Sequence, residues 1–343
     1  MRYIGLPALL ITLLAACTEK SDADYRAEIT ASIHDSIGED LAELVQASRD
    51  LQAASPSHAW NSTTDATAIT AMQEAWKHTR IAYEHVEGAV VALFPGIDTM
   101  LDARYEDILA KLGPDGDQHL FDGRGFTGMH AIERILYAPV IRTEVSTFES
   151  HLSGYQPAAY PATDDDAISF KTVLVQLLID QANGLRKQWQ PTAIDIGSAY
   201  QGLVGLMNEQ KDKVSLGATG QEESRYANLT LFDLRRNLEG TQKVYGLFRD
   251  WVRSKTAGAE WDATLQGKFD ELATLYAATT SDSLPAAPDG WSSDHPTADA
   301  LATPFGALWQ SVQESVDPSS NNSVVSQMNH IATLLGFPEF VAP

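Results

Sequence analysis

Apolar residues recur three and four positions apart along nearly the whole chain, and this spacing constrains the fold more than any other feature. It is the repeat of an α-helix that buries one face. Good helix formers fill the intervening positions, and we find no clear run of alternating β-branched residues. The sequence therefore predicts an all-α protein. The expected helices cover residues 25–51, 66–94, 101–112, 127–152, 167–189, 196–213, 222–254 and 261–278, with two or more after residue 297.

Segments rich in Gly, Pro, Ser or Asp interrupt this helical pattern, as connections between helices do. One of them, around residues 155–161, reads Tyr-Gln-Pro-Ala-Ala-Tyr-Pro and divides the chain into two helical halves. Helices with one apolar face must bury that face against other helices. We therefore expect two packed helical bundles, formed by residues 25–160 and 161–343.

The N-terminus has the pattern of an export signal. Arg2 precedes an apolar stretch at residues 4–14, which is too short to span a bilayer as a mature helix. Small residues then precede Cys17, as at the cleavage site of a bacterial lipoprotein. We predict a signal peptide at residues 1–16, a lipid on Cys17 and a tether at residues 17–24. An ordinary secretory signal that happens to contain a cysteine is the alternative.

Cys17 is the only cysteine, so this exported chain has no internal disulfide. Lipid on Cys17 would attach the protein to a membrane on its periplasmic or cell-surface side, and Thr18 after the cysteine, in place of Asp, favours the outer membrane. The net charge of −22 excludes nucleic acid as a partner, because binding it requires a basic surface. An acidic surface also raises the local concentration of cations.

The helix expected at residues 66–94 carries charged side chains in or near its apolar face. At about 100° per residue, Glu87 falls inside that face, and Arg80 and Glu84 lie close to it. A buried carboxylate needs a cation, a metal or a proton. Glu84 and Glu87 are three residues apart and can converge on one point. An ion pair between Arg80 and Glu84 would explain half of this pattern without any function.

A second group of candidates follows a Gly-rich loop, in a helix that is apolar on most of its circumference. Such a helix is expected to be buried. His130 and Glu133 are three residues apart, so an imidazole and a carboxylate would face one site inside the protein. Two interpretations stay open: a core histidine bonded to its neighbouring glutamate, or ligands for iron, zinc, copper or manganese.

Together these residues resemble the imelysin family, which was labelled as a family of metallopeptidases and includes the EfeO-like components of bacterial iron uptake. The family motif Gly-x-His-x-x-Glu stands here at Gly128, His130 and Glu133. Further segments match in the family order. They are Arg80 with Tyr83-Glu84-x-x-Glu87, Leu101-Asp102-Ala103-Arg104, Gly220-Gln-Glu-Glu223-Ser-Arg-Tyr226, and Phe232-Asp233-Leu-x-x-Asn237-x-Glu-Gly240.

The resemblance implies two helical bundles and a metal site. Its implied ligands are Glu84, Glu87, Asp102, His130 and Glu133, with Glu223 as a further candidate from the second half, and its implied supporting residues are Arg80, Tyr83, Arg104, Gly128, Asp233 and Asn237. Two departures matter. Asn228 and Thr230 replace a His and an Asp of EfeO-like members. The segment before Asp102 is one residue longer, which leaves open whether Asp98 or Asp102 faces the site.

A site of carboxylates and one imidazole is hard and anionic, so iron is the first choice, with zinc, copper and calcium as alternatives. We expect a non-enzymatic protein that captures or holds iron, or an iron-bearing ligand, for uptake, with an iron permease as a candidate partner. The alternatives are a metallopeptidase and a binder of haem or of an anionic polysaccharide. The sequence lacks the His-Glu-x-x-His string that supplies zinc ligands and a general base in many metallopeptidases.

Overall fold

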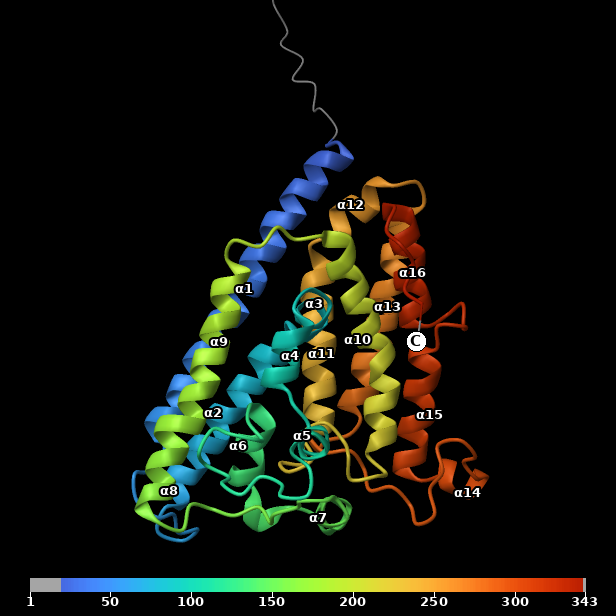
Figure 1. The fold of residues 1–343 in the computed structure, drawn as a ribbon. Coiled ribbons are helices and arrows are strands. Elements are labelled where there is room, and N and C mark those ends of the chain that lie inside the picture. The colour runs from blue at the N-terminus through green and yellow to red at the C-terminus, as the bar shows by residue number, and fades with distance from the viewer. Residues whose placement is uncertain (1–19, 342–343) are drawn as a thin grey trace, which may run out of the picture.

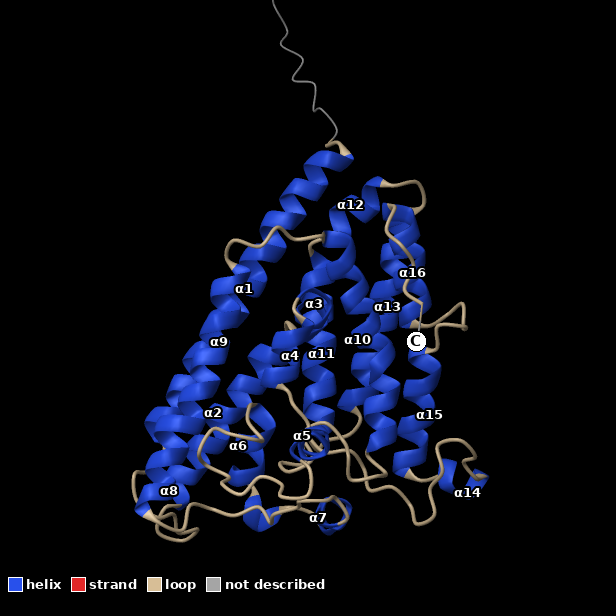
Figure 2. Ribbon diagram, viewed as in Figure 1, coloured by secondary structure: helices blue, strands red, loops and turns tan. Residues whose placement is uncertain are grey.

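The computed structural model describes residues 20–341, except for the side chains of residues 97 and 98. Every regular element in that range is a helix and none is a strand (Figure 2), so the all-α prediction is confirmed. None of these helices is both long and apolar enough to cross a bilayer. The predicted signal peptide and Cys17 lie outside the described residues, and the side chain of Asp98 is not described.

The helices follow one another along the chain with short connections. They are α1 (Asp22–Ala54), α2 (Ala66–Glu84), α3 (Glu87–Leu93), α4 (Pro95–Leu101), α5 (Tyr105–Leu112), α6 (Met129–Leu136), the 3-10 turn η1 (Ala138–Val140), α7 (Thr143–Ser150), α8 (Asp164–Ser169), the π-helical turn η2 (Phe170–Leu174), α9 (Val175–Trp189), α10 (Ile196–Leu216), α11 (Thr230–Gly246), α12 (Arg249–Ser254), α13 (Gly258–Ala277), α14 (Ala298–Leu301), α15 (Pro304–Val316) and α16 (Val324–Leu335).

Two groups of helices lie side by side, as Figure 1 shows. In one group α1 packs along α2 and α9, and in the other α10 packs with α11, α15 and α16, while α13 contacts α11 and α16. The groups are joined where α3 packs on α10 and α2 packs on α11. The expected pair of packed bundles is therefore present. α9 comes after residue 160 in the sequence but packs on α1, and the boundary at that residue stays a prediction.

The longest helix illustrates how the sequence produces this packing. Ser21 caps α1, and its side chain and that of Asp24 each bond the other's backbone N–H, which supplies partners for the free end of the helix. Ile29, Ile33 and Ile37 follow at intervals of four and are buried. This spacing puts them on one side of the helix, which faces the other helices of its bundle.

Two of the predicted helices are interrupted in the structure. The helix expected at 66–94 stops at Glu84 and restarts at Glu87, and the Asn237 side chain donates a hydrogen bond to the freed backbone carbonyl of Glu84 (3.3 Å). The helix expected at 127–152 is divided at η1 by Pro139, which has no N–H for a helical hydrogen bond.

Two further predicted helices start later than expected. Residues 102–104 are not helical, and α5 begins only at Tyr105. Residues 221–229 form a turn-rich loop, and α11 begins at Thr230 instead of residue 222. These two irregular stretches carry Asp102, Arg104 and Glu223, so they bring polar side chains to the interior between the bundles.

Candidate metal centre

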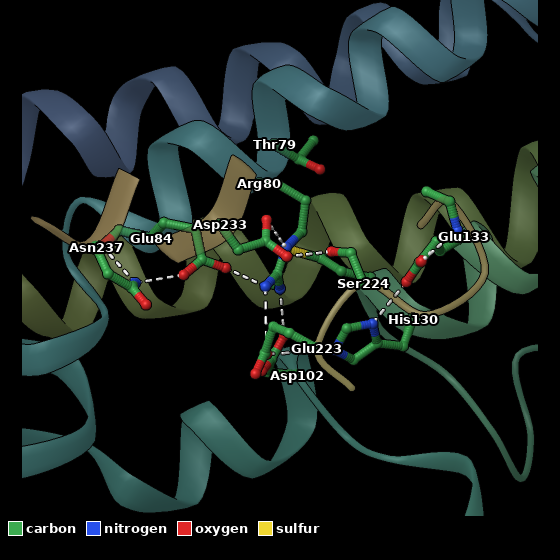
Figure 3. A network of polar contacts seen from close by, with 12 residues as sticks. Thr79, Arg80, Glu84, Asp102, His130, Glu133, Glu223, Ser224, Asp233 and Asn237 are labelled. Carbon is green, nitrogen blue, oxygen red and sulfur yellow. Dashed lines mark hydrogen bonds and ion pairs between the residues drawn. The ribbon is translucent and has the colours of Figure 1, made fainter. Parts of the chain in front are cut away.

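Arg80 lies in the middle of a buried polar cluster between α2, α6 and α11 (Figure 3). Its guanidinium forms ion pairs with Glu84 and Asp102, and with Glu223 at 3.3 Å and Asp233 at 3.5 Å. Arg80 and Glu84 are four residues apart on α2, so their predicted ion pair is confirmed. Four carboxylates thus surround one cation that has no access to solvent.

His130 lies beside this arginine on the first turn of α6. Gly128, at the N-terminus of that helix, has a φ of +88°, and a Cβ atom there would lie 2.5 Å from the backbone oxygen of Leu101. Only glycine allows this approach. It places α6 against the end of α4, and the Asp102 side chain follows immediately. His130 and Asp102 are therefore brought together by backbone contact as well as by charge.

Glu133 fixes the orientation of the His130 ring. Its Oε2 lies 2.7 Å from His130 Nδ1, and its Oε1 accepts hydrogen bonds from the backbone N–H groups of Tyr226 (2.9 Å) and Ala227 (2.8 Å). Both oxygens of Glu133 are thus in use. A carboxylate that accepts the Nδ1 proton leaves Nε2 as the ring nitrogen that can bind a metal.

Three possible ligands converge at that second nitrogen. His130 Nε2 is buried and lies 3.2 Å from Asp102 Oδ1 and 3.8 Å from Glu223 Oε1. One potential ligand atom from each of these residues lies within 4.8 Å of the other two. The side chain of Asp102 is 15% exposed, whereas those of His130 and Glu223 are 3% exposed, so Asp102 is on the side nearest solvent.

Glu84 lies on the opposite side of Arg80 from His130 (Figure 3), and Glu87 shares the Asn237 amide with Glu84. Lys213 of α10 binds both oxygens of Glu87 (2.9 and 3.1 Å) and lies 3.5 Å from Glu223 Oε2. The Asn237 amide donates to both glutamates, at 2.7 Å to Glu87 Oε2. Lys213 and Asn237 therefore hold Glu87 and Glu84 on this side, while His130 Nε2 faces Asp102 and Glu223.

The charges in the cluster shift several pKa values. Burial lowers the pKa of His130, but the charge of Asp102 and the hydrogen bonds that the ring donates to the surrounding carboxylates outweigh it and raise the pKa well above its usual range. Burial raises the pKa of Glu223, yet Lys213, His130 and the two nearby arginines hold it well below the usual range. Burial also raises the pKa of Asp233 to about 6, against the opposing charge of Arg80. A metal ion would thus have to displace a proton from His130.

The other residues predicted to support the site also have defined places. The ring of Tyr83 lies 5.7 Å from the Arg80 guanidinium. Arg104 donates hydrogen bonds to Glu223 Oε2 (3.2 Å) and to the Gln221 carbonyl (2.6 Å). Asp233 accepts a hydrogen bond from the Ser224 hydroxyl.

Sequence reasoning missed Lys213 and the backbone N–H groups of Tyr226 and Ala227. Lys213 follows Met207 and Gln210 at intervals of three on the buried face of α10. A lysine at such a position indicates a buried cation that needs carboxylate partners. The amide groups carried no such signal, because they belong to a loop whose shape depends on the Glu133 carboxylate.

Comparison with known proteins shows one family. The sequence profile described as Imelysin (Peptidase_M75) matches residues 37–308. An Efem/EfeO family lipoprotein of Staphylococcus haemolyticus (strain JCSC1435) is 26% identical over 282 residues, which are 79% of this chain and 84% of that protein. The iron uptake system component EfeO of Escherichia coli (strain K12) is 26% identical over 199 residues, or 58% of this chain and 42% of that protein.

A solved structure has the same fold. The crystal structure of an imelysin-like protein from Psychrobacter arcticum 273-4 aligns with a TM-score of 0.58 at 13% identity, over 94% of this chain and 99% of that chain. At this identity the likeness concerns the fold alone. The profile covers most of the chain and includes the Gly-x-His-x-x-Glu motif, so the protein belongs to the imelysin family.

Proposed function

We propose that this protein binds iron outside the cytoplasmic membrane, with Asp102, His130 and Glu223 as ligands. The observation that carries the proposal is the position of His130 Nε2, a buried nitrogen that lies 3.2 Å from Asp102 Oδ1 and 3.8 Å from Glu223 Oε1. One potential ligand atom from each of the three residues lies within 4.8 Å of the other two, and an imidazole with two carboxylates is a ligand set that suits a transition-metal ion. In this assignment Glu133 orients the imidazole, and Glu84 and Glu87 balance Arg80 and Lys213.

The choice of iron draws on ligand chemistry and on the relatives. Two carboxylates and one imidazole suit ferrous or ferric iron, although zinc, copper and calcium would also find ligands here. The E. coli relative is named as a component of an iron uptake system. By analogy, we infer that the present protein captures iron for uptake and passes it to a permease.

The cellular location is part of the same proposal. The S. haemolyticus relative is named as a lipoprotein, which supports lipid on Cys17 after removal of residues 1–16. With Thr18 in place of Asp, we place the anchored protein at the outer membrane, on its periplasmic or cell-surface side.

We propose a binder in preference to the metallopeptidase that the family label implies. A metallopeptidase needs a general base within reach of the attacking water. Glu133 is adjacent to the site, but one of its oxygens bonds His130 and the other bonds two backbone amides. Glu84 is fully buried and paired with Arg80.

Metal titration of the purified mature protein tests this function. We expect one Fe²⁺ per chain by anaerobic calorimetry, and loss of that binding in His130→Ala. In Glu133→Gln the side-chain NH₂ group would face another donor, either His130 Nδ1–H or the backbone N–H groups of residues 226 and 227. We therefore expect the affinity for Fe²⁺ to fall about 10- to 100-fold, which is the usual cost of losing a residue that orients a ligand.

The matched control is His78→Ala with Glu74→Ala, an exposed histidine and glutamate of α2 that are four residues apart. It should bind iron as the unmodified protein does. If His130→Ala binds iron as tightly as the unmodified protein does, His130 and Glu133 are a structural pair. Peptide cleavage that a chelator abolishes and Glu133→Gln removes would replace the binder with an enzyme.

A further inference from the structure

Arg80 occupies the same carboxylates that the proposed metal ion would use. Its two terminal nitrogens reach different ligands: Nη1 bonds Asp102 Oδ1, and Nη2 lies 3.3 Å from Glu223 Oε1. These two oxygens are the ones nearest His130 Nε2. The guanidinium and a metal ion would therefore compete for the same lone pairs, at neighbouring positions.

Arg80 stays beside these carboxylates whether or not a metal ion is bound. The side chain is fully buried on α2, so it has no route to solvent when a metal ion arrives. It does have two other partners, because Glu84 pairs with Nη2 and Asp233 lies 3.5 Å from Nε. Arg80 would thus keep Glu84 and Asp233 as partners if Asp102 and Glu223 bound a metal ion; Figure 3 shows these contacts. Its positive charge would remain beside the ion.

Other cations act on the same ligand. Glu223 Oε2 lies 3.2 Å from Arg104 and 3.5 Å from Lys213, so three basic side chains share this one carboxylate. A site that only had to bind iron as tightly as possible would not need them. In an interior of low dielectric, each fixed positive charge near the ligands opposes the arrival of another cation.

We propose that Arg80 is an internal counter-cation, which holds the ligand carboxylates when metal is absent and lowers the affinity of the site so that iron is released. This assignment rests on the proposed iron site. Arg80 is a positioning residue here, because it acts on the ion through Asp102 and Glu223. It would suit a protein that hands its iron on, since release then returns the carboxylates to a partner already in place.

The test compares Arg80→Met with the unmodified mature protein. The probes are Fe²⁺ under anaerobic conditions and Zn²⁺, which has no redox chemistry, and the readouts are affinity by calorimetry and release rate into a chelator. We expect Arg80→Met to raise affinity about tenfold or more and to slow release in proportion, because a fixed positive charge has been removed.

Two further variants make the result interpretable. Arg80→Met combined with Glu84→Gln removes the buried ion pair as a unit, which avoids leaving Glu84 unpaired if the single variant fails to fold. Arg134→Met is the matched control. Arg134 is another buried arginine, and it bonds Glu149 (2.9 and 3.1 Å) and the Gln156 carbonyl instead of the ligand carboxylates. The affinity of the Arg134→Met protein for Fe²⁺ and Zn²⁺ should stay near that of the unmodified protein.

Each outcome decides between the two assignments. Tighter metal binding by the folded Arg80 variants than by the unmodified protein supports the counter-cation role of Arg80. Metal binding by these variants alone supports it as well. Equal or weaker binding in these folded variants, while the unmodified protein binds through His130, overturns it and leaves the proposed iron site standing. Absence of binding in all proteins overturns both.

Discussion

Asp262 on α13 is a buried carboxylate with three donors around it. The Tyr245 hydroxyl donates at 3.0 Å, Arg249 Nε at 2.9 Å and Arg253 Nε at 2.6 Å. Burial raises the pKa of Asp262, but the hydrogen bonds from these three side chains outweigh it and hold the pKa below its usual value. The folded protein therefore binds the Asp262 proton less readily than the unfolded chain does.

We predict that Asp262→Asn destabilises the protein by about 2 kcal/mol at pH 7, the usual worth of hydrogen bonds to a charged group. The contribution is fully present above the unfolded pKa, about 4, and is lost as pH falls through the lower folded pKa. Urea unfolding at pH 7, 4 and 2.5 should show the two proteins converging at the acid end.

Asp270→Asn provides the control, because Asp270 is an exposed residue of the same helix. It should change the free energy of unfolding by less than about 0.5 kcal/mol at every pH. A difference between Asp262→Asn and the unmodified protein that stays constant from pH 7 to 2.5 would contradict the charge-based explanation.

At this scale the sequence predicted pairs within one helix better than pairs between distant elements. Arg80 with Glu84, and His130 with Glu133, were predictable because residues three or four apart share a helix face. The partnership of Lys213 with Glu87 joins residues 126 positions apart. No local pattern carries that information, because it depends on how α10 packs against α3.

At the scale of elements, most helix positions were predictable, but the breaks at residues 84–87 and 221–229 were not. Residues 84–87 contain neither Gly nor Pro, and buried residues continue on both sides of the break. The interruption depends on Asn237 of α11, which bonds the Glu84 carbonyl and both nearby carboxylates. The irregular stretch 221–229 likewise has helix-forming residues but is bound to Glu133 through its backbone.

The contact between α3 and α10 requires glycine at one crossing point. A Cβ on Gly202 would lie 2.0 Å from the backbone oxygen of Gly88. Alanine is intrinsically better than glycine in a helix by about 1 kcal/mol, whereas forcing atoms into a packed contact costs about 1–3 kcal/mol. Because the contact is with backbone, the clash should exceed the gain. We predict that Gly202→Ala lowers the free energy of unfolding by at least about 1 kcal/mol.

Gly267→Ala on α13 is the matched substitution, since a Cβ there meets nothing within 4 Å. It should stabilise the protein by up to about 1 kcal/mol. Urea unfolding of both variants beside the unmodified protein measures the two effects. If both substitutions changed the free energy of unfolding in the same direction, close packing at Gly202 would not explain the effect of Gly202→Ala.

At the scale of the whole molecule, one hydrophobic core runs through both groups of helices and includes residues from α1 to α16. The first half of the chain also depends directly on residues beyond 160. The indole N–H of Trp189 on α9 donates a hydrogen bond to the His34 carbonyl of α1 (2.9 Å), and the backbone N–H of Trp60 donates to the Pro161 carbonyl (2.9 Å). The Gln52 side chain bonds the Lys171 carbonyl (3.0 Å).

These contacts lead to a prediction about the boundary at residue 160. A fragment of residues 20–160 would expose the apolar face of α1 that α9 covers. Because burial of apolar surface stabilises a fold in proportion to the buried area, the fragment loses the stability that this contact provides. We expect this fragment to lack a cooperative thermal transition by circular dichroism, whereas residues 20–341 show a single one. Mixing it with residues 161–341 should restore helical signal, because the missing partner surface returns. A fragment 20–160 that melts cooperatively on its own would establish residue 160 as a true domain boundary, with α9 an accessory to the first bundle instead of a part of its core.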